Sequence, residues 1–209
     1  FITEMGSFLR VHGEPSDHAT LLRLAQHGSS SIMTLSETLH VPVGGTIHVY
    51  VAGSNQQFWD MQPGRAPTWA AGTAYPSIGA IYLRSPRVRG GQNGPLEQVL
   101  DHELIHILLG RAFAPQRTPQ WLQEGLAQTM SGEFGPHTTQ FLQEGMLGGG
   151  LISLHALSRG FPSDPLRARM AYAESADFIG YLRVTYGDDA VRTLIDELSH
   201  DATMAGAIR

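Results

Sequence analysis

The stretch "LEQVLDHELIHILLGRA" at residues 96–112 decides what fold and what chemistry are expected of this chain. It contains His102, Glu103 and His106 in the pattern H-E-x-x-H. Residues four apart share one face of a helix, so both imidazoles can reach one metal ion. Glu103 lies about 100° around the helix, where it can take a proton from a metal-bound water. The pattern predicts a helix with two metal ligands and a general base.

Apolar flanks predict that this helix is buried and covers residues 96–109. Leu100, Leu104 and Leu108 supply the flanking apolar side chains, and Gly110 is placed to end the helix. The alternative interpretation is a buried helix with two hydrogen-bonded structural histidines. The other eight of the ten histidines are, taken singly, expected to be surface or structural side chains.

A third metal ligand is needed, because catalytic zinc takes three protein ligands and leaves one position for water. The chain has no cysteine, so this ligand is expected to be His, Asp or Glu. Two similar segments compete for the role. "QWLQEGLAQ" at 120–128 places Glu124 18 residues after His106, whereas "QFLQEGMLG" at 140–148 contains Glu144.

The context of the two glutamates favours Glu124. It is expected in the second turn of a helix with Thr118 as N-cap and Pro119 at its first position. Gly125 would allow this helix to approach the histidine helix closely. Glu144 precedes Gly-Met-Leu and three glycines, where a helix ends, and a carboxylate there is exposed and opposed by the helix dipole. We therefore expect Glu124, and not Glu144, to bind one Zn²⁺ ion.

The elements on the two sides of the histidine helix are expected to differ in type. Upstream, the patterns predict a helix that ends about Leu39, and strands at 7–13, 44–53 and 79–85. Residues 54–78 are expected to be mostly loop, with a short helix near Gln56–Met61. Downstream, apolar spacing predicts helices at 119–131, 137–146, 166–186 and 189–199.

This segregation indicates an α+β fold rather than a doubly wound α/β fold. A small N-terminal mixed sheet with helices and the H-E-x-x-H helix are expected before a mostly helical C-terminal lobe. We expect one catalytic domain over residues 1–209, with an upper lobe at 1–110, a lower lobe at 111–209 and a cleft between the two.

Composition limits the partners. The net charge is −5 and no basic cluster is present, which argues against nucleic acid. The apolar runs are far shorter than the roughly 18 residues of a membrane-spanning helix. The absence of cysteine does not fix the compartment. Because the chain starts at Phe1 rather than Met, an extracytoplasmic location, or an anchor through a missing N-terminal segment, is the expectation. The oligomeric state is left open.

The ordered motifs resemble a known family. "DHELIH", followed by the glutamate of "WLQEGLA", is similar to the gluzincin zinc metallopeptidases of the thermolysin-like superfamily, and most of all to the bacterial peptidase MA-like family. "AYAESADFIGYLRVTYGDDAVRTLI" at 171–195 resembles the closing helices of that family. The resemblance covers roughly residues 79–199. It implies a zinc-dependent peptidase that acts on peptides or proteins, with His102, His106 and Glu124 as ligands and Glu103 as general base and acid.

The resemblance also implies a residue that stabilises the oxyanion. Members of the group use a Tyr or His from a later helix, and Tyr172 is the matching residue, with His137 and His155 as the other candidates. A phenol held near the ion could donate a hydrogen bond to the oxygen on which charge develops. Tyr172 could instead be a core tyrosine at the start of a packed helix.

Two further roles follow from the resemblance. Gly79, Ala80 and Ile81 of "GAIYL" resemble the cleft-edge strand that pairs with an extended peptide substrate; the alternative is an ordinary sheet strand. Gln128, one turn after Glu124, is placed to orient a histidine ligand; the alternative is a solvated helix residue.

The resemblance favours an endopeptidase over an aminopeptidase. Zinc aminopeptidases hold the free amine of the substrate with a glutamate in a G-x-M-E-N strand, and "GAIYL" contains no acid, although Glu174 could substitute. Two other functions stay open. One is a catalytically weak metal- or peptide-binding module of the same fold, and the other is a zinc hydrolase that acts on a non-peptide bond.

Overall fold

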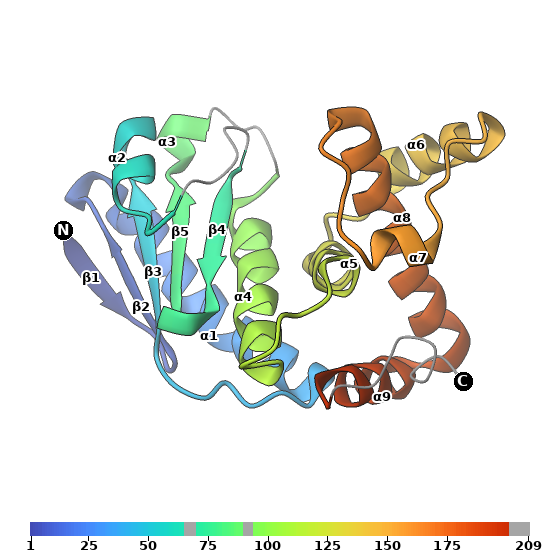
Figure 1. Cartoon of the computed structure of the whole chain (residues 1–209). Helices are drawn as coiled ribbons and strands as arrows, with labels where there is room; N and C mark the ends of the chain where they lie inside the picture. The colour runs from blue at the N-terminus through green and yellow to red at the C-terminus, as the bar shows by residue number, and fades with distance from the viewer. Residues whose placement is uncertain (65–69, 90–93, 201–209) are drawn as a thin grey trace. The chain divides into compact units, whose positions relative to one another are not determined.

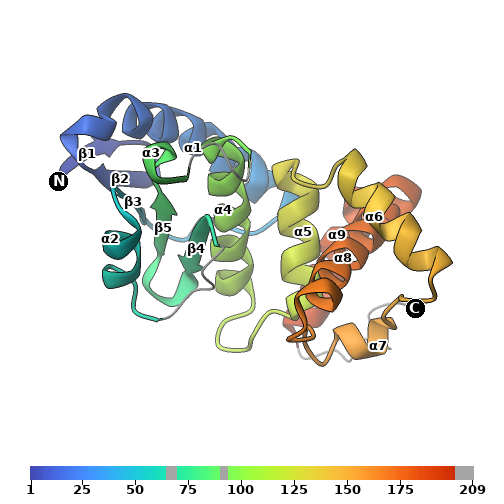
Figure 2. The same cartoon turned by 90° about the horizontal axis from the view of Figure 1, so that it is seen from above.

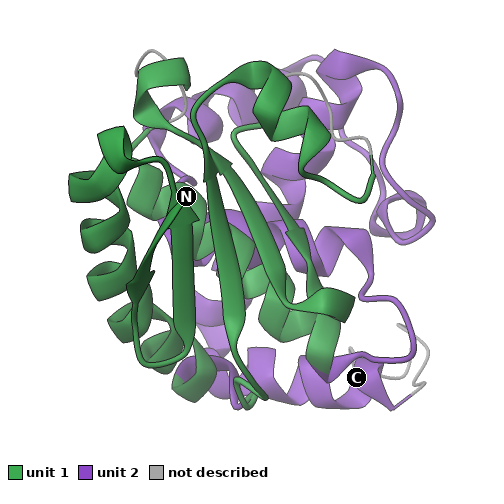
Figure 3. Ribbon diagram, turned by 90° about the vertical axis from the view of Figure 1, so that its left-hand side faces the viewer, with its two compact units in different colours: residues 1–37, 41–111 green, residues 38–40, 112–209 purple. Residues whose placement is uncertain are grey.

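The structure is a computed structural model that describes residues 1–64, 70–89 and 94–200. The described residues form two compact units (Figure 3). Unit 1 contains residues 1–37 and 41–111, and unit 2 contains residues 38–40 and the chain from Ala112 onward. The expectation that both belong to one catalytic domain, with a cleft between its lobes, stays a prediction.

Unit 1 is built around a mixed sheet, which has five strands within the described residues, in the order β1-β2-β3-β5-β4. Strands β2, β3 and β5 are parallel, and β1 and β4 pair antiparallel at the two ends of the sheet. The strands are β1 (Ile2–Met5), β2 (Leu9–Gly13), β3 (Ile47–Ala52), β4 (Gly72–Tyr75) and β5 (Ala80–Arg84). The predicted N-terminal mixed sheet is confirmed.

The sequence patterns found the inner strands and missed both outer ones. β2, β3 and β5 fall within the predicted strands. β1 and β4 are four residues long, and their side chains are mostly half-buried or exposed. Because an outer strand pairs on one side only, it needs few apolar residues, and its alternation is weak. The expectation of loop was therefore wrong for residues 72–75.

Helices cover both faces of the sheet (Figures 1 and 2). On one face, Gly28 lies so close to Leu9 and Leu100 that a Cβ there would be 2.5 and 3.0 Å from their Cδ2 atoms. On the other face, Phe58 packs with Tyr82. The helices of this part are α1 (His18–Leu39), α2 (Asn55–Asp60), α3 (Pro86–Arg89) and α4 (Leu96–Ala112), with 3₁₀ turns at Pro15–Asp17 and Pro76–Ile78.

The described part of unit 2 that follows Ala112 is helical. Its helices are α5 (Gln120–Ser131), α6 (Pro136–Leu147), α7 (Leu154–Leu157), α8 (Pro165–Tyr186) and α9 (Asp188–Ser199). These ranges match the predicted helices to within one or two residues, apart from the short α7. The α+β prediction, with a mostly helical C-terminal part, is confirmed. None of the helices in the described ranges is long and apolar enough to cross a membrane.

Three local predictions are wrong, and two of them fail for a tertiary reason. Gly110 does not end α4, which continues to Ala112; a Cβ at Gly110 would lie 2.4 Å from atoms of Pro76, so close packing explains the glycine. Pro119, with φ −55° and ψ 131°, occupies the N-cap of α5 in place of Thr118. Because proline sets only φ, its extended ψ keeps it outside the helix.

The third correction concerns Gly125, which allows a close approach to α8. A Cβ at this position would lie 2.5 Å from the Ser175 carbonyl oxygen and 2.8 Å from Ile179 Cγ1. One turn later, Thr129 Oγ1 donates to the Ala176 carbonyl at 3.1 Å. A small residue and a hydroxyl donor therefore bring the backbones of α5 and α8 together within unit 2.

A buried carboxylate ties the start of α1 to the end of β5. Asp17 is 3% exposed, accepts from Ser85 Oγ at 2.7 Å and receives both Nε and Nη2 of Arg87, at 2.9 and 2.7 Å. The Arg87 hydrogen bonds lower the pKa of Asp17 below its ordinary value, and the Ser85 hydroxyl adds to this against the opposing effect of burial. Ionised Asp17 is therefore favoured by the fold.

We predict that Asp17→Asn lowers the free energy of unfolding at neutral pH by about 1 to 3 kcal/mol, as expected for hydrogen bonds to a charged group. Because the pKa of Asp17 is lower in the folded state, its ionised form stabilises the fold above the ordinary aspartate pKa of about 3.9. This stabilisation is lost as the pH falls through the lower folded-state pKa. Urea unfolding measured from pH 7 to pH 3 should show that the free energy of unfolding falls less with acid in the variant than in the wild type.

The matched control for this prediction is Asp60→Asn, at an exposed carboxylate that accepts from Gln56 on the same helix. It should change the free energy of unfolding by about 0.5 kcal/mol or less. Equal effects of the two substitutions would show that the Asp17 network does not stabilise the fold.

Candidate functional site

The two histidines of the H-E-x-x-H pattern lie together on α4, as the helical spacing predicts. The ring centroids of His102 and His106 are 4.7 Å apart, with an angle of 79° between the ring planes. Both side chains are half-buried, while Leu104, Ile105 and Ile107 are fully buried. The helix thus presents both imidazoles on one face and buries the residues around them.

Polar contacts to α1 hold α4 in position within unit 1. Arg23 Nε donates to Glu97 at 3.2 Å, and His27 Nε2 lies 2.8 Å from Asp101 Oδ1. Ser31 Oγ donates to the same Asp101 oxygen at 2.5 Å. Because the partners advance by four residues on both helices, α1 and α4 are parallel and their register is set. Asp101 immediately precedes His102, so these contacts also fix the rotation of the helix at the histidine pair.

Glu103 is buried, with 6% of its surface exposed. Its carboxylate lies against Gly72 on β4: a Cβ at Gly72 would be 2.8 Å from Glu103 Oε1, 2.8 Å from Leu83 Cδ2 and 2.9 Å from Val99 Cγ1. The glycine leaves room for the carboxylate beside the outer strand of the sheet. The sequence patterns placed Gly72 in a loop, and nothing in the neighbouring residues predicts its contact with Glu103.

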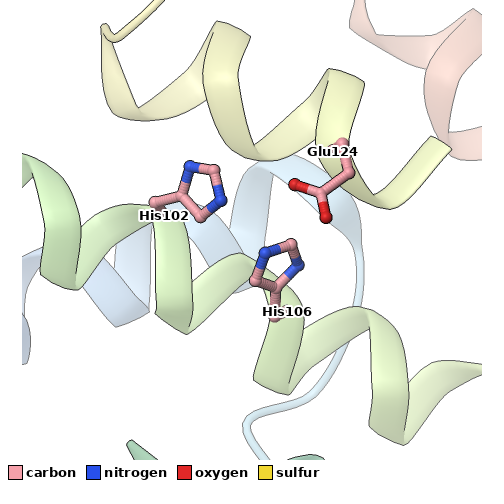
Figure 4. Close-up of side chains that lie close together, drawn as sticks. All are labelled: His102, His106 and Glu124. Carbon is pink, nitrogen blue, oxygen red and sulfur yellow. The ribbon is translucent and has the colours of Figure 1, made fainter. Parts of the chain in front are cut away.

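Glu124 lies on α5, and Figure 4 shows its carboxylate pointing toward the two imidazole rings. Ligand atoms of His102, His106 and Glu124 all lie within 4.8 Å of one another, and all three residues are half-buried. Two imidazole nitrogens and one carboxylate oxygen form a donor set used by catalytic zinc sites, which keep the fourth position open. The residues present therefore fit a zinc ion.

Glu144 lies apart from this group. Its side chain is exposed on α6, one turn from the end of the helix, and accepts from Gln140 Nε2 at 3.0 Å. Among the described residues, the group that could hold a metal contains Glu124 and not Glu144. His137 and His155, the alternative oxyanion donors, are both exposed.

Tyr172 lies in the second turn of α8 and is half-buried. Its ring packs edge-to-face against Phe161, with centroids 4.9 Å apart and an interplanar angle of 86°. Gln128 is half-buried on α5, one turn beyond Glu124. Their suggested roles, as oxyanion donor and as partner of a histidine ligand, stay predictions.

The structure places the predicted substrate-binding residues at an inner strand, β5. Ala80 and Ile81 pair with β3 on one side and with β4 on the other, and both are buried. The Gly79 carbonyl accepts from His48 N–H at 2.8 Å. These three residues therefore have no open edge for a peptide. In the described part of the chain, the outer strand on this side of the sheet is β4.

The fold and this group of side chains define a metallopeptidase-like protein. A sequence model of the Peptidase MA superfamily matches residues 27–209, and the chain belongs to that superfamily. The resemblance to a gluzincin, peptidase MA-like family is thereby confirmed at the level of the superfamily, whose peptidases typically use zinc. A comparison with curated proteins returned no match.

We predict that Gly72→Ala lowers the free energy of unfolding by about 1 to 3 kcal/mol, the usual cost of overpacking a filled core. The added methyl group would displace the Glu103 carboxylate, Leu83 or Val99, and circular dichroism during urea unfolding measures the loss. Gly64→Ala is the control, since its Cβ would lie 3.5 Å from the nearest contact atom among the described residues, the Tyr75 hydroxyl oxygen. Equal stability of Gly72→Ala and the wild type would contradict the close packing of Glu103.

Proposed function

We propose that this protein is a zinc-dependent endopeptidase. The observation that carries the proposal is the grouping of His102, His106 and Glu124, ligand atoms within 4.8 Å, on a chain of the Peptidase MA superfamily. Buried Glu103, between the two histidines in sequence, supplies a carboxylate for proton transfer. A metal-binding module would use the three ligands but not Glu103, so hydrolysis is the function that uses all four residues.

His102, His106 and Glu124 would hold one zinc ion, with Gln128 orienting a histidine ligand. Zinc bound by such a donor set lowers the pKa of water and polarises a carbonyl group. Glu103 would accept a proton from the attacking water at a carboxylate oxygen and pass it to the leaving amine nitrogen. Its burial beside Gly72 keeps competing solvent away from this proton.

Tyr172 would stabilise the developing oxyanion. Its phenol O–H is a hydrogen-bond donor of the kind that stabilises a tetrahedral oxyanion in acyl-transfer reactions. The half-buried position of the ring on α8, packed against Phe161, supports a held rather than a freely moving phenol.

The outer edge of β4 is the surface proposed to align a peptide substrate. Arg84 N–H donates to the Ala71 carbonyl at 3.1 Å, and the two residues are opposite each other in the β4–β5 register. Because antiparallel pairs alternate, the N–H and C=O groups of Gly72 and Ala74 point away from β5. An extended substrate could add beside them as a further strand, next to Glu103.

The hydrogen bonds of Glu174 within unit 2 support an endopeptidase rather than an aminopeptidase. Both of its carboxylate oxygens accept from the Ile152 backbone N–H, at 2.8 and 3.1 Å. Burial raises the pKa of Glu174, against the opposing effect of this hydrogen bond. A carboxylate that holds a backbone segment of unit 2 is poorly suited to bind the free amine of a substrate.

Matched variants test the proposal with bound zinc and casein hydrolysis as separate readouts. Glu103→Gln should keep zinc and lose about 10² to 10⁴ in hydrolysis, the usual contribution of general acid–base catalysis. Glu124→Ala should lose both zinc and hydrolysis. Glu144→Ala, the control at the similar "LQEG" segment, should keep both. Hydrolysis by the wild type should stop with a chelator and return with zinc.

Two outcomes would overturn parts of the proposal. Wild-type protein that binds zinc without any hydrolysis would indicate a metal-binding module. If Glu124→Ala and Glu144→Ala behaved alike, Glu124 would not be the third ligand.

Strand addition at β4 has its own test. Ala74→Pro removes an N–H that faces away from β5 and leaves the hydrogen bonds between β4 and β5 in place. Proline is tolerated at such positions in outer strands. Losing one substrate hydrogen bond should raise KM for a peptide about tenfold, equal to about 1.4 kcal/mol, with bound zinc unchanged. Thr73→Pro, which breaks the ladder, should instead lower the thermal stability. An unchanged KM in Ala74→Pro would rule out strand addition at this edge.

A further inference from the structure

The connection between α7 and α8 brings an aromatic side chain onto Tyr172. Phe161 lies in this connection, half-buried, and its ring meets the Tyr172 ring edge-to-face at 4.9 Å and 86°. Pairs of this geometry stabilise by about 0.5 to 1.5 kcal/mol beyond their buried area. The contact therefore favours one orientation of the phenol over others.

Gln120 anchors Phe161 to the helix that carries Glu124. The Phe161 backbone N–H donates to Gln120 Oε1 at 3.2 Å, and Gln120 lies one turn before Glu124 on α5. The preceding Gly160 has φ +124°, a conformation that favours glycine, and its N–H donates to the Leu157 carbonyl at 3.2 Å. The backbone is thus held at Phe161 and at the residue before it.

We propose that Phe161 is a positioning residue for the Tyr172 hydroxyl, and that Gln120 is its anchor. The inference rests on the proposed function, in which Tyr172 donates a hydrogen bond to the oxyanion. Gln120, Phe161 and Tyr172 all belong to unit 2. Together with the α5–α8 contact at Gly125, they connect the phenol to the helix of the proposed ligand Glu124 by two routes.

A held ring is needed because an oxyanion donor acts over a narrow range of distance. Effective donors lie about 2.7 to 3.1 Å from the oxyanion, and a misplacement of about 1 Å can cost about 10²-fold in rate. Buried neighbours Ala171 and Ala173 fix the backbone of α8 at this point. The rotation of the Tyr172 side chain needs a contact to the ring itself, and Phe161 supplies one.

A double-mutant cycle in the zinc-loaded full chain, with a casein-derived peptide as substrate, tests the inference. Phe161→Leu should lower kcat about tenfold, with KM and bound zinc unchanged, and Phe161→Tyr, which keeps the ring, should restore it to within about threefold. Tyr172→Phe should lower kcat about 10²-fold. In the Tyr172→Phe background, Phe161→Leu should cost less than about twofold, because no hydroxyl remains to be positioned.

Gln120 has its own pair of variants. Gln120→Leu, which removes the acceptor, should lower kcat about threefold or more, whereas Gln120→Glu, which keeps an acceptor oxygen, should not. Tyr186→Leu is the control, since Tyr186 belongs to another edge-to-face pair of unit 2, with Tyr181 at 6.1 Å and 84°, at the C-terminal end of α8. It should leave kcat within about twofold of the wild type.

The outcomes separate this inference from the proposed function. A full tenfold loss from Phe161→Leu in the Tyr172→Phe background would overturn the positioning role alone. Activity that is unchanged in Tyr172→Phe would remove both the oxyanion role of Tyr172 and the inference, with zinc hydrolysis still standing. A zinc-loaded wild type that hydrolyses nothing would end the proposed function and the inference with it.

Discussion

Burial of Glu103 against the outer strand is the constraint on which the candidate site depends. A carboxylate is costly to bury, so its position must be supported on every side. Gly72 leaves room for it, and the buried residues Leu104, Ile105 and Ile107 prevent α4 from turning to expose it. Once the rotation of α4 is set in this way, helical spacing puts His102 and His106 together on a neighbouring face.

The parallel pairing of α1 and α4 supports the same constraint from the far side of the helix. Asp101 is in hydrogen-bond contact with two residues of α1, His27 and Ser31. These contacts hold α4 in place next to His102, although Asp101 is not one of the proposed ligands. In unit 2, the close approach of α5 and α8 at Gly125 plays the corresponding role for Glu124 and Tyr172. Each unit thus holds its own part of the proposed chemistry rigidly.

Prediction from the sequence succeeded where the signal was local. The two histidines share a face because they are four residues apart, and Glu144 is exposed because it stands near a helix end. It failed where the partner lies far along the chain. Gly125 approaches α8 rather than the histidine helix, because the Ser175 backbone, fifty residues away in sequence, occupies that side. Gly110 packs so closely against Pro76 that a side chain would not fit, and nothing in the neighbouring residues predicts this contact.

The sequence by itself determined the helix of the H-E-x-x-H pattern, the segregation of strands from helices and the preference for Glu124 over Glu144. These follow from periodicity and from the chemistry of helix ends, which act over a few residues. Only the tertiary structure decided that, within the described residues, β5 is an inner strand and β4 is an outer one, because strand order is set by pairing between distant segments. The contact of Phe161 with Tyr172 is of the same kind, since it arises where a connection folds back onto a helix.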